Sequence, residues 1–179
     1  MKMRIPMRSL DFWKTVVRDG SDLLEELIPL LEKQRVRFCV VGGQGVNAYV
    51  DPLVSLDLDL AIAAQDIQRI ESLLAPRFRV ESFPHSLNVS QPGSDLRVQI
   101  QTDPRYAEFV DRAERRNILG LTLPVARVED VLQGKIWAVQ DATRRRSKRQ
   151  KDLADIARLL ESYPDLRASV PPEVLSRLM

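Results

Sequence analysis

The sequence predicts a mixed α+β fold, in which helices pack on one β-sheet and a helical segment ends the chain. Short runs with the two-residue alternation of β-strands occupy roughly the first two thirds of the sequence. Segments with helical spacing separate these runs, and beyond Pro124 only helical patterns remain. We therefore expect a core over residues 1–125 that begins with N-terminal helices. A C-terminal helical segment over residues 126–179 should pack on it, so that the two form one compact unit.

The elements are expected in an order that mixes helices and strands. Helices are expected near 10–19 and 21–34, followed by strand 37–41, a glycine turn, helix 44–50, strand 56–62, helix 64–75, strands 77–82, 86–90 and 95–101, helix 104–114 and strand 116–123. Three further helices are expected near 127–141, 149–162 and 171–178. No internal repeat or low-complexity linker separates these parts, which again favours one unit.

Composition favours a soluble, cytoplasmic protein. Of the 179 residues, 44% are hydrophobic and 29% are charged, as in an ordinary globular domain. No run of about 18 apolar residues is present to span a bilayer, and Met1 to Arg8 lack the apolar stretch of a signal peptide. Cys39 and His85 are the only cysteine and histidine, so most zinc sites and histidine-based triads are excluded. We expect Cys39 to be buried and inert, and His85 to lie at the surface.

Asp57 and Asp59 are the most informative residues. Apolar residues at 56, 58, 60 and 62 alternate with them, so both carboxylates of this strand point to one face. Two buried carboxylates at this spacing would repel each other and lose hydration, and a divalent cation would compensate for both effects. Alternatively, Asp57 only ends the loop after Pro52 and Asp59 faces water.

A glycine turn precedes this strand. Gly42 and Gly43 follow the apolar strand 37–41 and lead into a short helix, where backbone N–H groups can face a phosphate. The same segment also fits the dinucleotide-binding fingerprint through Gly43-x-Gly45-x-x-Ala48. That fold requires a full crossover helix and one acid about 20 residues further on. Here Pro52 ends the helix early and the acids are paired, so the dinucleotide alternative is disfavoured.

Together, the strand, the Gly-Gly turn, the short helix and Ser55-x-Asp57-x-Asp59 resemble the polymerase-beta-type nucleotidyltransferase superfamily. The resemblance covers about residues 36–162 and is greatest to the small bacterial minimal nucleotidyltransferases, including AbiEii-type toxins. It implies Mg²⁺ or Mn²⁺ on Asp57 and Asp59, and a nucleoside triphosphate held by Gly42, Gly43 and Ser55. It further implies transfer of a nucleoside monophosphate to a hydroxyl of RNA, protein or a small molecule. Such a protein can belong to a toxin–antitoxin or phage-defence system and have an antitoxin partner.

The C-terminal helices extend this resemblance. Lys135 on the first helix and Lys151-Asp152-x-x-Asp155 on the second resemble the paired helices of the family. The resemblance implies that Lys135 or Lys151 contacts the triphosphate. An ion pair between lysine and aspartate that only joins the two helices is an equally good interpretation, with Asp152 and Asp155 at the margin of the buried stripe.

Gln99 weakens the prediction of an active enzyme. In active relatives a third carboxylate lies on the strand that corresponds to 95–101, and Gln99 aligns with it. A glutamine amide can ligate a metal weakly but cannot accept a proton at neutral pH. Asp95 and Asp103 share its parity but lie roughly 13 Å away along an extended strand. The alternative function is therefore a catalytically degenerate nucleotide-binding or interaction module.

A basic run follows the first of the paired helices. It contains six positive charges within eight residues: Arg144, Arg145, Arg146, Lys148, Arg149 and Lys151. Such a run is usually a solvated loop or helix end. Its position in the nucleotidyltransferase pattern favours a second possibility, contact with the phosphates of RNA or nucleotide.

Overall fold

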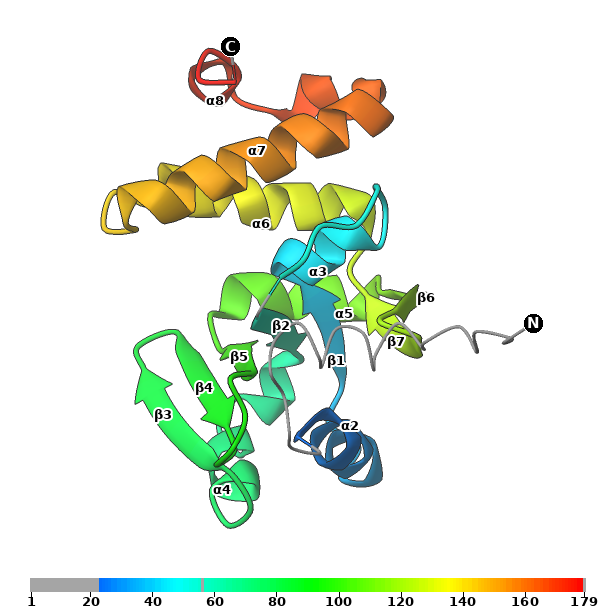
Figure 1. Ribbon diagram of the computed structural model, residues 1–179, viewed down its shortest axis with the longest axis vertical. Coiled ribbons are helices and arrows are strands. Elements are labelled where there is room, and N and C mark those ends of the chain that lie inside the picture. The colour runs from blue at the N-terminus through cyan, green and yellow to red at the C-terminus, as the bar shows by residue number, and fades with distance from the viewer. Residues whose placement is uncertain (1–22, 56, 179) are drawn as a thin grey trace, which may run out of the picture.

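The computed structural model describes residues 23–55 and 57–178, and its centre is one seven-stranded sheet (Figure 1). The strand order is β3-β4-β5-β2-β1-β7-β6. The strands are β1 (Phe38–Val41), β2 (Asp57–Ile62), β3 (Arg79–Phe83), β4 (Ser86–Ser90), β5 (Arg97–Gln101), β6 (Glu114–Ile118) and β7 (Leu121–Val125). The pairs β2–β5 and β1–β7 are parallel and the other four pairs are antiparallel, so the sheet is mixed, as the sequence predicts.

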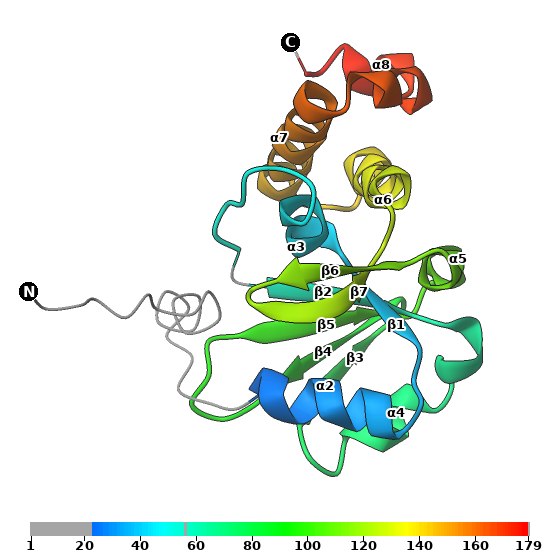
Figure 2. The same ribbon diagram turned by 90° about the vertical axis from the view of Figure 1, so that its right-hand side faces the viewer.

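Helices cover both faces of the sheet (Figure 2). Helices α2 (Leu23–Lys33) and α4 (Ile70–Leu74) lie on one face, above a core that includes Leu58, Leu60 and Ile62 of β2. Helices α3 (Gly42–Asn47), α6 (Val128–Gln140) and α7 (Arg146–Ser162) lie on the other face. The core on this second face includes Ala61, the fifth residue of β2. Because strand side chains alternate, Asp57 and Asp59 share the face of Ala61 and point toward α3, α6 and α7.

The C-terminal part of the described chain is helical. Helices α6 and α7 form an antiparallel pair, and a 3-10 helix over Pro164–Ser169 leads to the short α8 (Pro172–Leu175). Helix α7 begins at Arg146 rather than near 149, so most of the basic run lies on its first turns. The division of the chain at residue 125 stays a prediction. No helix among the described residues is long and apolar enough to cross a membrane.

Several elements differ from the sequence-based expectation. Residues 114–125 form a hairpin of β6 and β7 instead of one strand over 116–123, because Leu119 (φ 55°) and Gly120 (φ 82°) make a turn. Pro124 lies within β7, opposite Arg115, although we expected it to follow the sheet. The helix expected over 64–75 divides into a 3-10 turn at Ala64–Asp66 and α4. The buried Asp66 side chain accepts hydrogen bonds from the Arg37 backbone N–H and from the Arg69 guanidinium, so its partners lie outside the 3-10 turn.

Two further elements differ from the expectation, and one expected helix cannot be compared. The helix expected over 104–114 is a 3-10 turn at Pro104–Tyr106 followed by α5 (Ala107–Asp111). Gly42 and Gly43 are the first residues of α3 and not a separate turn. The helix expected over 10–19 lies outside the described residues.

Candidate functional site

The junction of β1 and α3 places a glycine against a carboxylate. Gly42 follows β1 with φ of +63°, a backbone conformation that favours glycine. A Cβ atom at this position would lie 2.1 Å from Asp59 Oδ2, closer than any side chain allows. Gly43 has an ordinary φ, and a Cβ there would lie 3.3 Å from Ser55 Oγ. Gly42 therefore leaves the space that the Asp59 carboxylate occupies.

Gln99 lies beside Asp59 in the parallel pair β2–β5. The register pairs Asp57 with Arg97 and Asp59 with Gln99, so these two strands bring the positions together. The Gln99 amide Nε2 donates to Ser86 Oγ at 3.2 Å on the neighbouring strand β4. On β5, the side chain next to Asp59 is therefore an amide and not a carboxylate.

The two aspartates lie in different electrostatic surroundings. Asp57 has Arg97 Nε at 3.6 Å from Oδ1 and Lys148 Nζ at 3.9 Å from Oδ2. Burial raises the pKa of Asp59 to about 6; the positive charge of Lys135 opposes this effect and the negative charge of Asp57 adds to it. The positive charges nearby therefore do not fully compensate for the desolvation of Asp59.

A cavity of about 510 Å³ opens beside this pair. Four of the predicted site residues line it: Gly42, Asp59, Gln99 and Lys135. The other four, Gly43, Ser55, Asp57 and Lys151, are not among its lining residues. Sequence reasoning missed most of the remaining wall, which includes His85, Gln101, Asp103, Arg105, Tyr106, Asp130, Trp137, Gln140, Asp141, Arg144 and Asp152.

The missed residues gave only weak signals in the sequence. Arg105 and Tyr106 lie in a turn. Trp137 is the only large aromatic residue of α6, and its helical spacing did not distinguish it from a core residue. His85 is exposed, as expected, but it also lines the cavity. The β4–β5 pairing and the packing of α6 bring these positions together, and neither can be inferred from local pattern.

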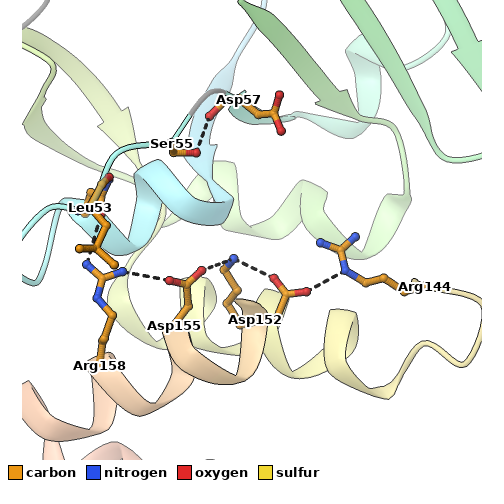
Figure 3. A network of polar contacts seen from close by, with 9 residues as sticks. Leu53, Ser55, Asp57, Arg144, Asp152, Asp155 and Arg158 are labelled. Atoms are coloured by element: carbon orange, nitrogen blue, oxygen red, sulfur yellow. Dashed lines mark hydrogen bonds and ion pairs between the residues drawn. The ribbon is translucent and has the colours of Figure 1, made fainter. Parts of the chain in front are cut away.

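A buried ion network joins α6 to α7 (Figure 3). Lys135 Nζ lies 2.9 Å from Asp152 Oδ1 and 2.7 Å from Asp155 Oδ2. Arg144 Nε lies 2.7 Å from the other Asp152 oxygen, and Arg158 Nη1 lies 2.9 Å from the other Asp155 oxygen. Asp152 and Asp155 are 2% and 4% exposed, so the expectation that they lie at the margin of the buried stripe is wrong. They are buried because each carboxylate has two cations as partners.

Lys135 keeps its positive charge within this network. Burial alone would lower the pKa of Lys135, but the nearby Asp152 and Asp155 outweigh burial and raise it above the usual value. These contacts agree with the structural interpretation of the lysine–aspartate pair. Lys135 also lines the cavity, whereas Lys151 is exposed on α7.

The same network continues to the loop before β2. The Arg158 guanidinium donates to Asn47 Oδ1 at 3.3 Å and to the carbonyl of Asp51. Asn47 in turn holds Leu53 by two hydrogen bonds, of 2.6 Å to its carbonyl and 3.0 Å from its N–H. Ser55 Oγ donates to the Asp57 carbonyl at 3.2 Å. Helix α7 therefore helps to position the segment that ends at Asp57.

The basic run does not act as one surface. Arg144 pairs with the buried Asp152 and Lys148 lies near Asp57, whereas Arg145 and Arg146 are exposed. Of the two interpretations of this run, the solvated loop does not describe Arg144, which pairs with a buried carboxylate. The helical packing of α6 on α7, which the local sequence does not reveal, brings Asp152 next to it.

The donor set fits a divalent cation only in part. Among the described residues, no group of three or more histidine, cysteine, aspartate or glutamate side chains is placed to hold a metal. Mg²⁺ is commonly bound by one or two protein carboxylates together with substrate phosphates. Asp57 and Asp59 on one strand face fit this arrangement of two carboxylates and substrate phosphates, in which the ion arrives with a triphosphate.

Solved structures of nucleotidyltransferases share this fold. Residues of the chain align with the antibiotic-resistance factor ANT(2″)-Ia in complex with adenylyl-2″-tobramycin, at a TM-score of 0.56 and 14% identity, over 88% of this chain and 97% of that one. The lincosamide antibiotic adenylyltransferase LnuA, lincomycin-bound, aligns at a TM-score of 0.51 and 16% identity, over 78% and 98%. At these identities the comparison establishes the fold of the nucleotidyltransferase superfamily, as the sequence predicts.

The family is established by sequence. The profile of the family described as nucleotidyl transferase AbiEii toxin, type IV toxin–antitoxin system, matches residues 58–177. The chain therefore belongs to the AbiEii nucleotidyltransferase toxin family, which confirms the resemblance found in the sequence. The match includes Asp59, Gln99, Lys135 and Lys151 and begins just after Asp57. No functionally curated protein sequence matches the chain.

Proposed function

We propose that this nucleotidyltransferase moves a nucleoside monophosphate from a nucleoside triphosphate to a hydroxyl of an RNA, a protein or a small molecule, in the presence of Mg²⁺ or Mn²⁺. The observation that carries the proposal is the Asp59 carboxylate, which lies against Gly42 in the wall of the cavity with Asp57 on the same strand face. The fold of adenylyltransferase structures supports the reaction class. The toxin family supports a role in a toxin–antitoxin system with an antitoxin partner.

Each residue has a role in this proposal. Asp57 and Asp59 hold the divalent ion, which when bound orients the triphosphate and offsets the charge that develops on it. The N–H groups of Gly42 and Gly43 donate to the phosphates, and the Ser55 hydroxyl lies next to Gly43. Lys135 provides a buried positive charge in the cavity wall, and the exposed Lys151 provides a second charge at longer range.

The acceptor hydroxyl attacks the α-phosphorus in line and pyrophosphate leaves. Loss of the acceptor proton requires a base, and the Gln99 amide cannot accept that proton. The identity of Gln99 therefore favours a second function, a nucleotide-binding or interaction module with little or no turnover. Phosphates of an RNA acceptor would meet Arg145 and Arg146, the exposed part of the basic run. A cytoplasmic location stays a prediction.

The test replaces both carboxylates and retains their shape. Asp57→Asn with Asp59→Asn should abolish the magnesium-dependent thermal stabilisation by nucleoside triphosphates, since amides are poor ligands for a hard cation. At a ligand concentration of 100 Kd the stabilisation of the wild type should be about 2.7 kcal/mol. Transfer of label from α-labelled nucleotides to cellular RNA should disappear with it. Asp165→Asn, at an exposed aspartate beyond α7, serves as the matched control. Stabilisation that the double variant retains would overturn the assignment of the pair.

A further inference from the structure

Part of the cavity wall is a layered arrangement of flat groups. Trp137 of α6 stacks on Phe109 of α5 with ring centroids 5.6 Å apart and planes 7° apart. Arg105 Cζ lies 4.8 Å from the centre of the Trp137 ring. The Tyr106 ring meets both aromatic rings edge-on, at 5.3 and 5.4 Å. Phe109, Trp137 and Arg105 thus form a stack whose members Arg105 and Trp137 line the cavity.

The Arg105 guanidinium is held in place by Asp103. Its Nε and Nη2 donate to Asp103 Oδ2 at 2.9 and 2.7 Å, and the Arg105 backbone N–H donates to Asp103 Oδ1 at 3.0 Å. The Arg105 side chain is nevertheless 58% exposed. Trp137 and Asp103 therefore fix the plane of a group that still presents surface to a ligand.

The charge of Arg105 is largely compensated while its plane remains available. The Arg105 guanidinium holds the pKa of the Asp103 carboxyl below its usual value, so the two groups stay a charged pair. A guanidinium that already binds a carboxylate attracts a phosphate less strongly. Its flat face can still stack on a planar ring, as arginine does with nucleobases in protein–RNA complexes.

We propose that Arg105, backed by Trp137 and fixed by Asp103, is a stacking platform for a nucleobase in the wall of the cavity that Asp59 also lines. The proposal rests on the proposed function and adds a subsite to it. The ring belongs either to the nucleoside triphosphate or to a nucleotide of an RNA acceptor, since both present the same chemistry. Gln101, His85 and Gln140 line the same cavity and offer hydrogen-bonding groups for the edge of a ring.

The cavity lining favours a planar ring over an aliphatic ligand. Apart from the aromatic rings, most of the residues that line the cavity are polar, so an aliphatic group would desolvate them without hydrogen bonds in return. A nucleobase satisfies both parts, because its face stacks and its edge carries donors and acceptors.

The experiment uses Trp137 as its own reporter. Trp13 is the only other tryptophan, so Trp13→Phe leaves Trp137 as the single source of tryptophan fluorescence. The full chain is titrated with ATP, GTP, CTP, UTP and inorganic tripolyphosphate, each with Mg²⁺, and separately with a short single-stranded oligoribonucleotide and its abasic analogue. Calorimetry measures affinity in parallel.

If the ring is that of the donor, we expect quenching of the Trp137 fluorescence that depends on the base. At least one nucleotide should then bind more tightly than tripolyphosphate. The same difference between the oligoribonucleotide and its abasic analogue is expected if the ring is that of the acceptor. Arg105→Ala should weaken the base-containing ligand by about 5- to 140-fold, the factor that corresponds to the stacking of one base. It should leave the affinity for tripolyphosphate or the abasic analogue unchanged. Arg77→Ala, at an exposed arginine in the turn between α4 and β3, is the control.

The outcomes separate this proposal from the proposed function. Affinities that do not depend on the base in either titration, or that Arg105→Ala leaves unchanged, overturn the platform. Nucleotidyl transfer that depends on Asp57 and Asp59 would then still support the proposed function. Base-dependent binding that Arg105→Ala removes, in a protein with no transfer to any acceptor, supports the platform and contradicts the proposed reaction.

Discussion

Two clusters of charge lie a short distance apart on the same side of the sheet and differ in how their charges are compensated. At the seam of α6 and α7, Asp152 and Asp155 each contact two cations within 3 Å. On β2, Asp57 has two cations only at 3.6 and 3.9 Å, and Asp59 forms no ion pair with any described residue. The first cluster lies between α6 and α7, and the second faces these helices from the sheet.

The difference separates a structural cluster from a ligand site. Buried charges that are paired and hydrogen-bonded hold two helices in one arrangement, and removal of one partner is costly. Burial, which the nearby cations do not fully offset, raises the pKa of Asp59, and a carboxylate in this state favours any cation that arrives. The paired cluster should therefore control stability, and the unpaired one should control binding.

The largest expected effect on stability comes from breaking the compensated cluster. Lys135→Met should lower the free energy of unfolding by about 3–5 kcal/mol, because Asp152 and Asp155 lose their shared partner. Lys151→Met, at an exposed lysine of α7, should change it by less than about 0.5 kcal/mol. Urea unfolding of both variants measures the difference. Similar values for the two lysines would show that the network contributes little.

A new carboxylate beside Asp59 tests the uncompensated cluster. Gln99→Asp should raise nucleotidyl transfer by about 10²–10⁴-fold, the usual range for a general base, because Gln99 lies opposite Asp59 in the register. Gln101→Asp, two residues along the same strand face and also in the cavity wall, is the matched control. Label transfer to an acceptor measures both. Fast transfer by the wild type that Gln99→Ala leaves unchanged would assign the base to another residue.

A side chain at position 42 should disturb the site of Asp57 and Asp59. Gly42→Ala and Gly93→Ala both force a positive φ on a non-glycine residue, at a cost of about 1–2 kcal/mol. Only the Cβ at position 42 would also meet Asp59, since the Cβ at position 93 has nothing within 4 Å. We expect magnesium-dependent nucleotide affinity to fall in Gly42→Ala alone, as measured by calorimetry. An equal effect of both changes would remove Gly42 from the site.

The smallest expected effect on stability comes from the exposed part of the basic run. Arg145→Gln with Arg146→Gln should leave the free energy of unfolding within about 0.5 kcal/mol. It should reduce the salt dependence of RNA binding, by a slope of about 0.7 for each contact to a single strand that is lost. Arg144→Gln should instead lower stability by about 1–3 kcal/mol, because it leaves a buried Asp152 oxygen without its partner. Filter binding over a range of salt concentrations decides the first point, and an unchanged slope would exclude phosphate contact.

Local pattern sufficed for features that depend on alternation and helical spacing. The apolar positions of β2 place Asp57 and Asp59 on one face whatever the rest of the chain does, and the helical spacing around Lys135 and Asp152 predicts two amphipathic helices. The motifs and their order also indicated the family to which the chain belongs. The hairpin of β6 and β7 was missed because its turn contains one glycine and its second strand contains a proline.

Only the tertiary structure decided which of these residues meet. The lysine–aspartate motif is compatible with a phosphate contact or with an ion pair, and the packing of α6 on α7 forms the ion pair. Arg105 and Trp137 are 32 positions apart in a sequence that gives no reason to join them, and they meet because the 3-10 turn that leads into α5 lies beside α6 on the same face of the sheet. Sequence by itself determined the residue types and the strand face on which the carboxylates lie, because these depend on periodicity. The compensation of each charge depends on distances between elements far apart in the chain, and these distances exist only once the helices have packed on the sheet.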